Sequence, residues 1–276
     1  MKALVLGASG QLGSELVRLL DDDVGVTHRQ VSITDAQGVD GLLATRRPDV
    51  VFNCAAYNAV DRAETEPELA LEVNSNGPFH LASACSRHGA RLVHFSTNFV
   101  FDGRLDRPYL ESDAPSPLGA YARSKLEGER RVLEAMPAAL VIRTAGVFGG
   151  TAGQSFPEKI LQRARHGDRL RVVSDQMVNP TFTADLAPAA LRLAADGLEG
   201  LVHVVAAGCC SWHEYATAVL GELKVKVGVD PVSTAGFGAA APRPLNGCLA
   251  STRVEALRFW REGLHEWALR AAAEYP

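Results

Sequence analysis

The chain has 276 residues, of which 47% are hydrophobic and 22% are charged. This is the composition of a globular protein with a core of its own, and it excludes disordered and fibrous classes. A formal net charge of -4 gives no general attraction to nucleic acid or to an anionic membrane surface, and no apolar run approaches the roughly 20 residues that span a bilayer.

The first half of the chain alternates short β-rich runs with helical segments. Apolar runs predict strands at 3–6, 24–28, 50–52, 92–95 and 140–142. Apolar residues at helical spacing, together with stop residues, predict helices at 11–20, 35–45, 74–88 and 121–136. Strands that are apolar throughout and alternate with helices form parallel sheets covered on both faces. We therefore expect an α/β fold with a doubly wound parallel sheet of the Rossmann type.

The second half is less regular. It predicts helices at 156–166, 183–194 and 253–273, the last with a break near Gly263, and strands at 170–173 and 201–205. The segment 236–244, rich in Gly, Ala and Pro, predicts a loop. We expect a dinucleotide-binding core and a smaller, mostly C-terminal lobe that caps a cleft at the strand ends. The predicted division assigns residues 1–150 and 181–205 to the core, and 151–180 and 206–276 to the substrate-binding lobe.

Five cysteines stand at positions 54, 85, 209, 210 and 248. Their odd number, wide spacing and lack of a C-x-x-C pair argue against a disulfide framework and against a zinc site. We interpret them as small buried hydrophobic residues. The sequence thus predicts no metal site, and a reducing, cytoplasmic setting with small-molecule chemistry.

The first predicted strand runs directly into a glycine-rich turn. Gly7, Gly10 and Gly13 are spaced G-x-x-G-x-x-G between an apolar run and an amphipathic helix. A helix N-terminus without bulky side chains offers free backbone N–H groups and a positive dipole end to a pyrophosphate. The motif therefore predicts a dinucleotide site, with an ordinary strand–helix turn as the alternative.

The end of the second predicted strand bears on the choice between NAD and NADP. An acidic residue there would bind the ribose 2′-hydroxyl of NAD. This chain has Thr27-His28-Arg29-Gln30 instead. Arg29 could pair with a 2′-phosphate, so we favour NADP and keep NAD as possible. In the alternative interpretation Arg29 is a solvated loop residue.

Tyr121 and Lys125 lie four residues apart on a predicted helix, which places both on one face. A free tyrosine has a pKa of about 10, and a nearby ammonium lowers that pKa by stabilising the phenolate. The pair could then give a proton to a carbonyl oxygen while a hydride reaches the carbon. An amphipathic surface helix gives the same spacing. The position after the fourth strand of the predicted sheet favours the chemical interpretation.

Thr97 lies in the segment Ser96-Thr97-Asn98, directly after that fourth strand. Hydroxyl groups just past the carboxyl end of a parallel strand project into the ligand crevice. Thr97 could hold a substrate carbonyl by a hydrogen bond and help to polarise it. The alternative is a cap at the end of the strand.

Taken together, these segments resemble an extended short-chain dehydrogenase/reductase, and specifically the dTDP-4-dehydrorhamnose reductase group. The matching segments occur in the family's order and cover nearly the whole chain: 7–13, 53–61, 96–103, 121–125 and 243–246. The first and fourth are signals of the whole superfamily, whereas the second and third point to this group.

The resemblance implies NAD(P)H as the hydride donor and a set of residue roles. Tyr121 would be the proton donor, Lys125 would contact the ribose and Tyr121, and Thr97 would lie at the substrate oxygen. The pyrophosphate would be held by Gly10, Gln11 and Leu12. The cofactor would be lined by Ala56, Tyr57 and Asn58.

Several positions depart from the family's pattern. The family usually has aspartate where Asn98 stands and threonine where Asn58 stands. In the family's R-T-S-W stretch this chain has Arg143-Thr144-Ala145-Gly146, so one aromatic wall of the sugar pocket is missing. Asn98 and Gly146 are therefore candidate substrate contacts at which the particular sugar is selected.

Charged residues supply two further expectations. Arg243 stands in the glycine-rich loop of the smaller lobe and is a candidate for binding a substrate phosphate. The acidic run Asp61, Glu64, Glu66 and Glu68 predicts a solvated helix start, although related enzymes use carboxylates at a dimer contact. We expect a monomer or a homodimer.

Two functions fit these observations. The first is an NAD(P)H-dependent reductase of a nucleotide-linked 4-keto-6-deoxy sugar, without nucleic-acid or membrane partners. The second is a non-catalytic NADP-binding partner protein on the same fold, as in the regulatory subunit of methionine adenosyltransferase, which resembles this group. Because Thr97, Tyr121 and Lys125 are all retained, we favour the enzyme.

Overall fold

A parallel sheet forms the centre of the protein. The computed structural model describes residues 2–20, 24–150, 155–167 and 169–274. In this part of the chain the main sheet has six strands in the order β10-β5-β4-β3-β1-β2, all paired in parallel. The strands are β1 (Ala3–Leu6), β2 (Gly25–Val26), β3 (Val50–Asn53), β4 (Arg91–Thr97), β5 (Leu140–Thr144) and β10 (Gly200–His203). The predicted fold class is confirmed.

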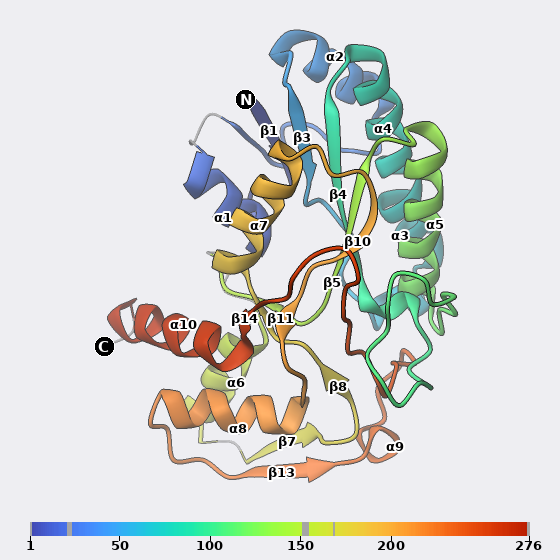
Figure 1. Ribbon diagram of the computed structural model, residues 1–276. Helices are drawn as coiled ribbons and strands as arrows, with labels where there is room; N and C mark the ends of the chain where they lie inside the picture. Colours follow the sequence, from blue (N-terminus) through green and yellow to red (C-terminus); the bar gives the residue numbers. More distant parts are fainter. Residues whose placement is uncertain (1, 21–23, 151–154, 168, 275–276) are drawn as a thin grey trace.

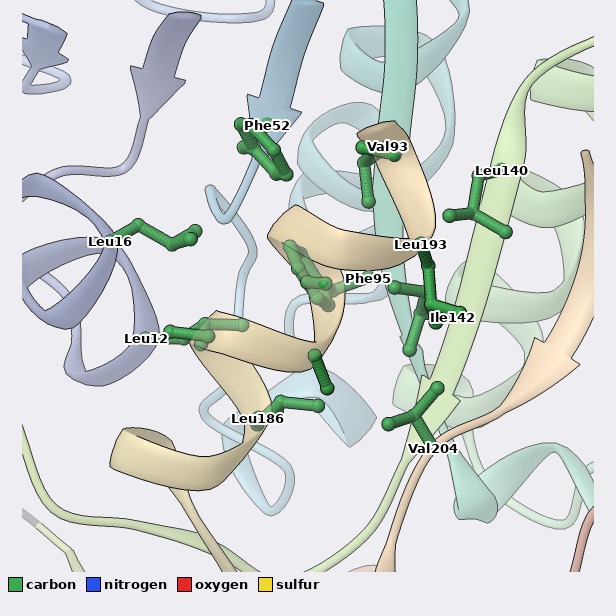
Figure 2. Packing of buried hydrophobic residues seen from close by; sticks show 14 of the residues in the cluster. Leu12, Leu16, Phe52, Val93, Phe95, Leu140, Ile142, Leu186, Leu193 and Val204 are labelled. Atoms are coloured by element: carbon green, nitrogen blue, oxygen red, sulfur yellow. The ribbon is translucent and has the colours of Figure 1, made fainter. Parts of the chain in front are cut away.

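Helices cover both faces of this sheet (Figure 1). One face carries α1 (Gln11–Leu20) and α7 (Thr183–Ala195), and the other carries α2 (Ala36–Arg46), α4 (Gly77–His88) and α5 (Ala120–Ala135). Side chains alternate along the strands, so Val5 packs with α1 and α7 while its neighbours Leu4 and Leu6 pack on the opposite face. Figure 2 shows the first of these cores, in which Leu12 and Leu16 of α1 lie against the sheet beside Leu186 of α7.

The order of the strands reverses at β1. Its neighbours are β2 on one side and β3 on the other. In open α/β sheets the ligand crevice lies outside the carboxyl ends of the strands at such a switch point. The segments that follow β1 and β3 therefore form the edge at which a cofactor is expected.

A smaller lobe lies below the carboxyl ends of the strands (Figure 1). Its core gathers aromatic side chains around Tyr215, with Phe148, Trp260 and Trp267 among them. Its helices are α6 (Phe156–Arg165), α8 (Trp212–Glu222), α9 (Thr234–Phe237) and α10 (Trp260–Glu274). Short strands pair in twos: β6 (Val147–Phe148) with β9 (Thr181–Phe182), β7 (Leu170–Val173) with β13 (Val229–Val232), β8 (Met177–Val178) with β12 (Cys210–Ser211), and β11 (Ala206–Ala207) with β14 (Leu257–Phe259).

Two helical predictions are wrong in detail. The predicted helix 74–88 is α-helical only from Gly77, where α4 begins. Its first three residues belong to a π-helical turn (Glu72–Asn76) that follows α3 (Pro67–Leu71). The predicted helix 253–273 begins only at Trp260, after β14, and its predicted break near Gly263 does not occur, because α10 passes through it without interruption. A Cβ at Gly263 would lie 3.1 Å from Cβ of Phe182, so this glycine allows close packing of the helix.

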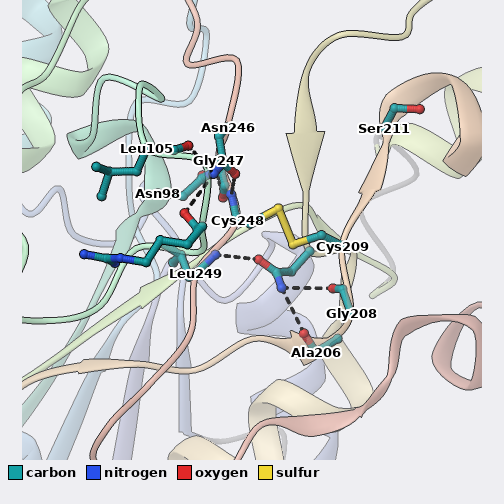
Figure 3. Close-up of a disulfide and its surroundings, with 12 residues drawn as sticks. Asn98, Leu105, Ala206, Gly208, Cys209, Ser211, Asn246, Gly247, Cys248 and Leu249 are labelled. Atoms are coloured by element: carbon teal, nitrogen blue, oxygen red, sulfur yellow. Dashed lines mark hydrogen bonds between the residues drawn. A yellow bond between two sulfur atoms is a disulfide. The ribbon is translucent and has the colours of Figure 1, made fainter.

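The expectation that the cysteines form no disulfide is also wrong. Cys209 and Cys248 are bonded, with their Cα atoms 6.2 Å apart (Figure 3). The bond joins the loop after β11 to a segment 39 residues further along the chain. Asn179 supports the same contact, because its amide group donates to the carbonyls of Ala206 and Gly208 and accepts from the N–H of Leu249. The two cysteines are distant in the sequence and meet only in the folded protein, so the spacing of the cysteines does not predict their disulfide.

The other three cysteines are free thiols, and Cys85 and Cys210 are buried as expected.

None of the helices in the described ranges has the length and apolar character of a membrane-spanning segment. Within the same ranges, no group of three or more His, Cys, Asp and Glu side chains is arranged to hold a metal ion.

Candidate active site

The glycine turn lies tightly against the segment that follows β3. Gly7 has a φ of +75°, and a Cβ there would lie 2.6 Å from the backbone nitrogen of Ala55. A Cβ at Gly13 would lie 2.1 Å from the carbonyl oxygen of Gly7. The turn is held by hydrogen bonds from Gly7 N to Val26 O and from Gly10 N to Gly7 O, at 3.0 and 2.9 Å. Any side chain at these positions would fill the space in which the turn and α1 approach each other.

The start of α1 suits an anionic group. The N–H groups of its first turn, at Gln11, Leu12 and Gly13, have no acceptor within the helix by the geometry of a helix start. They lie at the positive end of the helix dipole, beside the crevice. The side chain of Leu12 packs into the core, so this residue can contribute only its backbone. The glycine cradle and the free helix start therefore fit a dinucleotide pyrophosphate.

The segment after β3 is fixed by a residue that the sequence analysis missed. Asn74, fully buried in the π-helical turn, accepts from Tyr57 N at 2.9 Å and donates to Tyr57 O at 3.0 Å. The same amide nitrogen donates to the hydroxyl of Ser124 on α5, at 3.0 Å. Asn74 therefore holds the Ala56–Asn58 segment and α5 in one arrangement. Its sequence signal is weak, since π-helical turns, which are frequent at functional sites, have no simple motif.

Arg29 lies in an exposed turn directly after β2. This places it on the same edge of the sheet as the glycine turn, where a group that selects a 2′-phosphate is expected. Both interpretations given above are compatible with this position, so its role stays a prediction.

Tyr121 and Thr97 come together at the carboxyl end of β4. Tyr121 stands in the first turn of α5 and is 8% exposed, as is Thr97, whose side chain lies close enough to lower the pKa of the Tyr121 hydroxyl. The Tyr121 hydroxyl also donates to Oδ1 of Asn58 at 3.5 Å, and the ring packs edge-on against Phe99. Oγ1 of Thr97 accepts from Phe99 N at 3.2 Å, so the strand-end cap is present as well.

The expected effect of Lys125 on Tyr121 is wrong for this structure. Burial raises the pKa of Tyr121 to about 12, and the nearby Thr97 side chain opposes this rise only in part. The ammonium of Lys125 instead donates to the carbonyl oxygen of Phe95 at 2.7 Å. Burial lowers the pKa of Lys125 to about 8. Lys125 is buried against β4, its contact with the ribose stays a prediction, and the Tyr121 phenol keeps its proton through neutral pH.

Two candidate substrate residues are engaged in the protein interior. Asn98 is buried, and its Nδ2 donates to Gly247 O of the smaller lobe at 2.8 Å (Figure 3). Gly146 has a φ of +54°, and a Cβ there would lie 2.9 Å from Asn179 O. This backbone has no room for the tryptophan that the family usually carries. An aromatic wall for the sugar cannot come from position 146.

Arg243 is engaged in an ion pair in this structure, and its expected role at a substrate phosphate stays a prediction. Its guanidinium donates to both carboxylate oxygens of Asp61, at 3.0 and 2.8 Å. Asp61 also accepts from Ala241 N at 3.0 Å. This Asp61–Arg243 latch ties the loop of the smaller lobe to the segment that lines the crevice.

The acidic run is also more than a solvated helix start. Glu64 accepts from Ala120 N at 2.7 Å and so caps the helix that carries Tyr121. Glu66 accepts from the Tyr57 hydroxyl and from Arg62. These carboxylates position the walls of the site, and sequence spacing alone could not show their partners.

We expect the latch to be a measurable interaction. Asp61→Ala and Arg243→Ala should each lower the free energy of unfolding by about 0.5–1 kcal/mol, because the pair is partly exposed and screened by solvent. The double variant should lose less than the sum of the two. Urea unfolding of the four proteins measures this coupling, and fully additive losses would contradict the latch.

The fold and the site together define a class of protein. The glycine cradle lies at the switch point of a parallel sheet, and a buried Tyr-x-x-x-Lys pair stands on α5 of the same sheet. This is the arrangement of an NAD(P)-dependent oxidoreductase of the short-chain dehydrogenase/reductase class.

Comparison with known proteins identifies the family within this class. The family described as RmlD substrate binding domain matches residues 1–272, and the chain belongs to it. A dTDP-4-dehydrorhamnose reductase of Mycobacterium tuberculosis is 43% identical, with 95% of this chain and 91% of the relative covered. A probable dTDP-4,6-dihydroxy-2-methyloxan-3-one 4-ketoreductase of Streptomyces antibioticus is 39% identical, with 100% and 98% covered.

Solved structures agree with this assignment. A dTDP-4-dehydrorhamnose reductase of Clostridium acetobutylicum superposes with a TM-score of 0.94 at 34% identity, with 99% of this chain and 100% of that chain covered. A dTDP-4-dehydrorhamnose reductase of Bacillus anthracis in complex with NADP superposes with a TM-score of 0.93 at 33% identity, with 98% and 100% covered.

Proposed function

We propose that this protein is an NADPH-dependent reductase of a dTDP-linked 4-keto-6-deoxy sugar, with dTDP-4-dehydrorhamnose as the first substrate to test. The observation that carries the proposal is the meeting of Tyr121 and Thr97 at the carboxyl edge of β4, beside the glycine cradle. The names of several relatives at 34–43% identity, and the NADP complex of a structural neighbour, support the same substrate class and cofactor.

Each residue at this edge has a chemical role in the proposal. Thr97 holds the keto oxygen by a hydrogen bond, and Tyr121, whose phenol is protonated at neutral pH, gives that oxygen a proton. NADPH, when bound, supplies the hydride. Lys125 contacts the ribose from beneath the crevice. The pyrophosphate is held by the backbone at Gly7, Gly10, Gln11, Leu12 and Gly13, with Ala56, Tyr57 and Asn58 along the cofactor and Arg29 at a 2′-phosphate.

The proposal also assigns cofactor binding and sugar binding to different parts of the chain. Residues 1–150 and 181–205 bind the cofactor, while 151–180 and 206–276 bind the nucleotide sugar. Separate hydrophobic cores around the sheet and around Tyr215 support this division. We further propose a monomer or homodimer that works on small molecules in the cytoplasm.

The experiment is an NADPH oxidation assay with purified protein. dTDP-4-dehydrorhamnose should be reduced with one NADPH consumed per sugar, and NADH should be the poorer donor. A panel of other nucleotide-linked 4-keto sugars tests the selection of the sugar. A protein that binds NADPH but leaves every keto sugar unreduced would support the non-catalytic partner protein instead.

A further inference from the structure

A buried group of charges lies directly behind Lys125. Glu129 stands one turn further along α5 and is 3% exposed, like Lys125. Its carboxylate accepts two hydrogen bonds from Arg143 of β5, at 2.9 and 2.6 Å, and another from the Ser96 hydroxyl of β4. The guanidinium of Arg143 also lies over the ring of Phe101, 5.1 Å from its centroid. Three elements of the core thus fix one carboxylate beneath the crevice.

The groups that face Lys125 differ in the charge they bring. From β4 comes His94, whose pKa is held well below its usual value by burial and by the charge of Lys125. From the segment after β3 comes Cys54, whose thiol pKa burial raises above its usual range. On α5 itself stands Tyr121, which is protonated at neutral pH. Glu129 is the carboxylate among these groups, one turn after Lys125 on α5. The Ser96 hydroxyl that it accepts from belongs to the residue next to Phe95, whose carbonyl holds the ammonium, and the charge of Glu129 raises the pKa of Lys125 against the effect of burial.

We propose that Glu129 is a positioning residue for the reaction: oriented by Arg143 and Ser96, it keeps the buried ammonium of Lys125 charged and in place beneath the crevice. Only the expected effect on catalysis rests on the proposed function. The charge of Lys125 itself can be measured without cofactor or substrate.

Glu129 and Arg143 are predicted to act on Lys125 in opposite directions. Glu129→Gln removes the negative charge beside the ammonium, so the pKa of Lys125 should fall by about one unit from its value of about 8. Arg143→Met removes the cation that neutralises Glu129, so the same pKa should rise. A merely structural role for the ion pair would predict the same change in both variants, since both break the same contact.

Isotope-edited NMR gives the direct readout. The chain has only five lysines, at 2, 125, 159, 224 and 226. Protein labelled with ¹³C-lysine therefore gives few signals, and Lys125→Arg identifies the one that belongs to Lys125. A pH titration should give a midpoint lower than wild type for Glu129→Gln and higher for Arg143→Met. Shifts of the same sign, or midpoints within about 0.2 pH units of the wild-type midpoint, would overturn the proposal.

A double variant keeps the test available if the single variants, each of which leaves an unpaired buried ion, do not fold. The double variant Glu129→Gln/Arg143→Met leaves the net charge of the buried group unchanged and leaves no unpaired ion at either position. Its midpoint should also lie below that of wild type, because the lost carboxylate is the group that acts on Lys125. An unchanged midpoint in a folded double variant would contradict the role of Glu129.

The catalytic consequence is tested separately. If Lys125 must be charged to contact the ribose, NADPH affinity should fall at alkaline pH, and this fall should move to lower pH in Glu129→Gln. Failure of the proposed function would appear as a wild-type protein without reductase activity but with the opposite NMR shifts intact. Failure of the inference would appear as an active enzyme without those shifts.

Discussion

Tyr121→Phe is expected to lower kcat for reduction of the keto sugar by about 1,000-fold, while the Kd for NADPH stays within about twofold of wild type. The substitution removes the proton donor and leaves the ring in place against Phe99. The lost hydroxyl makes a long hydrogen bond to Asn58, 3.5 Å, so little structural support is lost with it. NADPH oxidation measures kcat, and quenching of protein fluorescence measures the Kd.

Tyr109→Phe is the matched control. It deletes the hydroxyl of another buried tyrosine, which donates to Asp102 at 2.8 Å in a loop away from the glycine cradle. This variant should keep kcat within about threefold of wild type, since it removes no group from the reacting carbonyl. If Tyr121→Phe were no slower than this control, the assignment of the proton donor would be wrong.

The pKa of Tyr121 also gives this assignment a physical basis different from the one that the sequence suggested. The spacing of Tyr121 and Lys125 correctly placed both side chains on one face of α5, the face that packs against β4. It did not show that Lys125 donates to Phe95 O, or that burial governs the pKa of Tyr121. Spacing along a helix gives the face on which side chains lie, whereas their partners depend on the strands packed against that face.

The same distinction separates the parts of the fold that could be predicted from those that could not. The strands and helices of the sheet carry local signals, namely apolar runs, helical spacing and stop residues, and these gave the parallel sheet correctly. The Asp61–Arg243 latch joins residues 182 positions apart, and the Cys209–Cys248 disulfide joins residues 39 positions apart. Neither contact has a local signal, so the sequence did not indicate the Asp61 partner of Arg243, and the interpretation of Cys209 and Cys248 was wrong.

Gly146 shows a third limit. The missing tryptophan was visible in the sequence, but the reason for it was not. The φ of +54° and the nearness of Asn179 O are properties of the folded backbone. The change at this position therefore belongs to how the smaller lobe packs on the core.

The second large effect is expected at the glycine cradle. Gly13→Ala should lower the free energy of unfolding by about 3 kcal/mol and abolish measurable NADPH binding. Gly13 lies inside α1, a conformation that alanine prefers, so propensity alone would predict stabilisation. The added Cβ would lie 2.1 Å from Gly7 O and 2.8 Å from Gly7 C, however. These are backbone atoms of the turn that receives the pyrophosphate, and they cannot yield without opening it.

Gly41→Ala in α2 separates the two effects. Gly41 is also helical, but it is exposed and an added Cβ there meets nothing within 4 Å. This variant should raise the free energy of unfolding by up to about 1 kcal/mol and leave NADPH binding unchanged. Urea unfolding and NADPH titration of both variants compare the same chemical change in two surroundings. If both substitutions stabilised the protein, the turn would have room for a Cβ at Gly13. The close approach of α1 to the turn after β1 would then not determine the cofactor site.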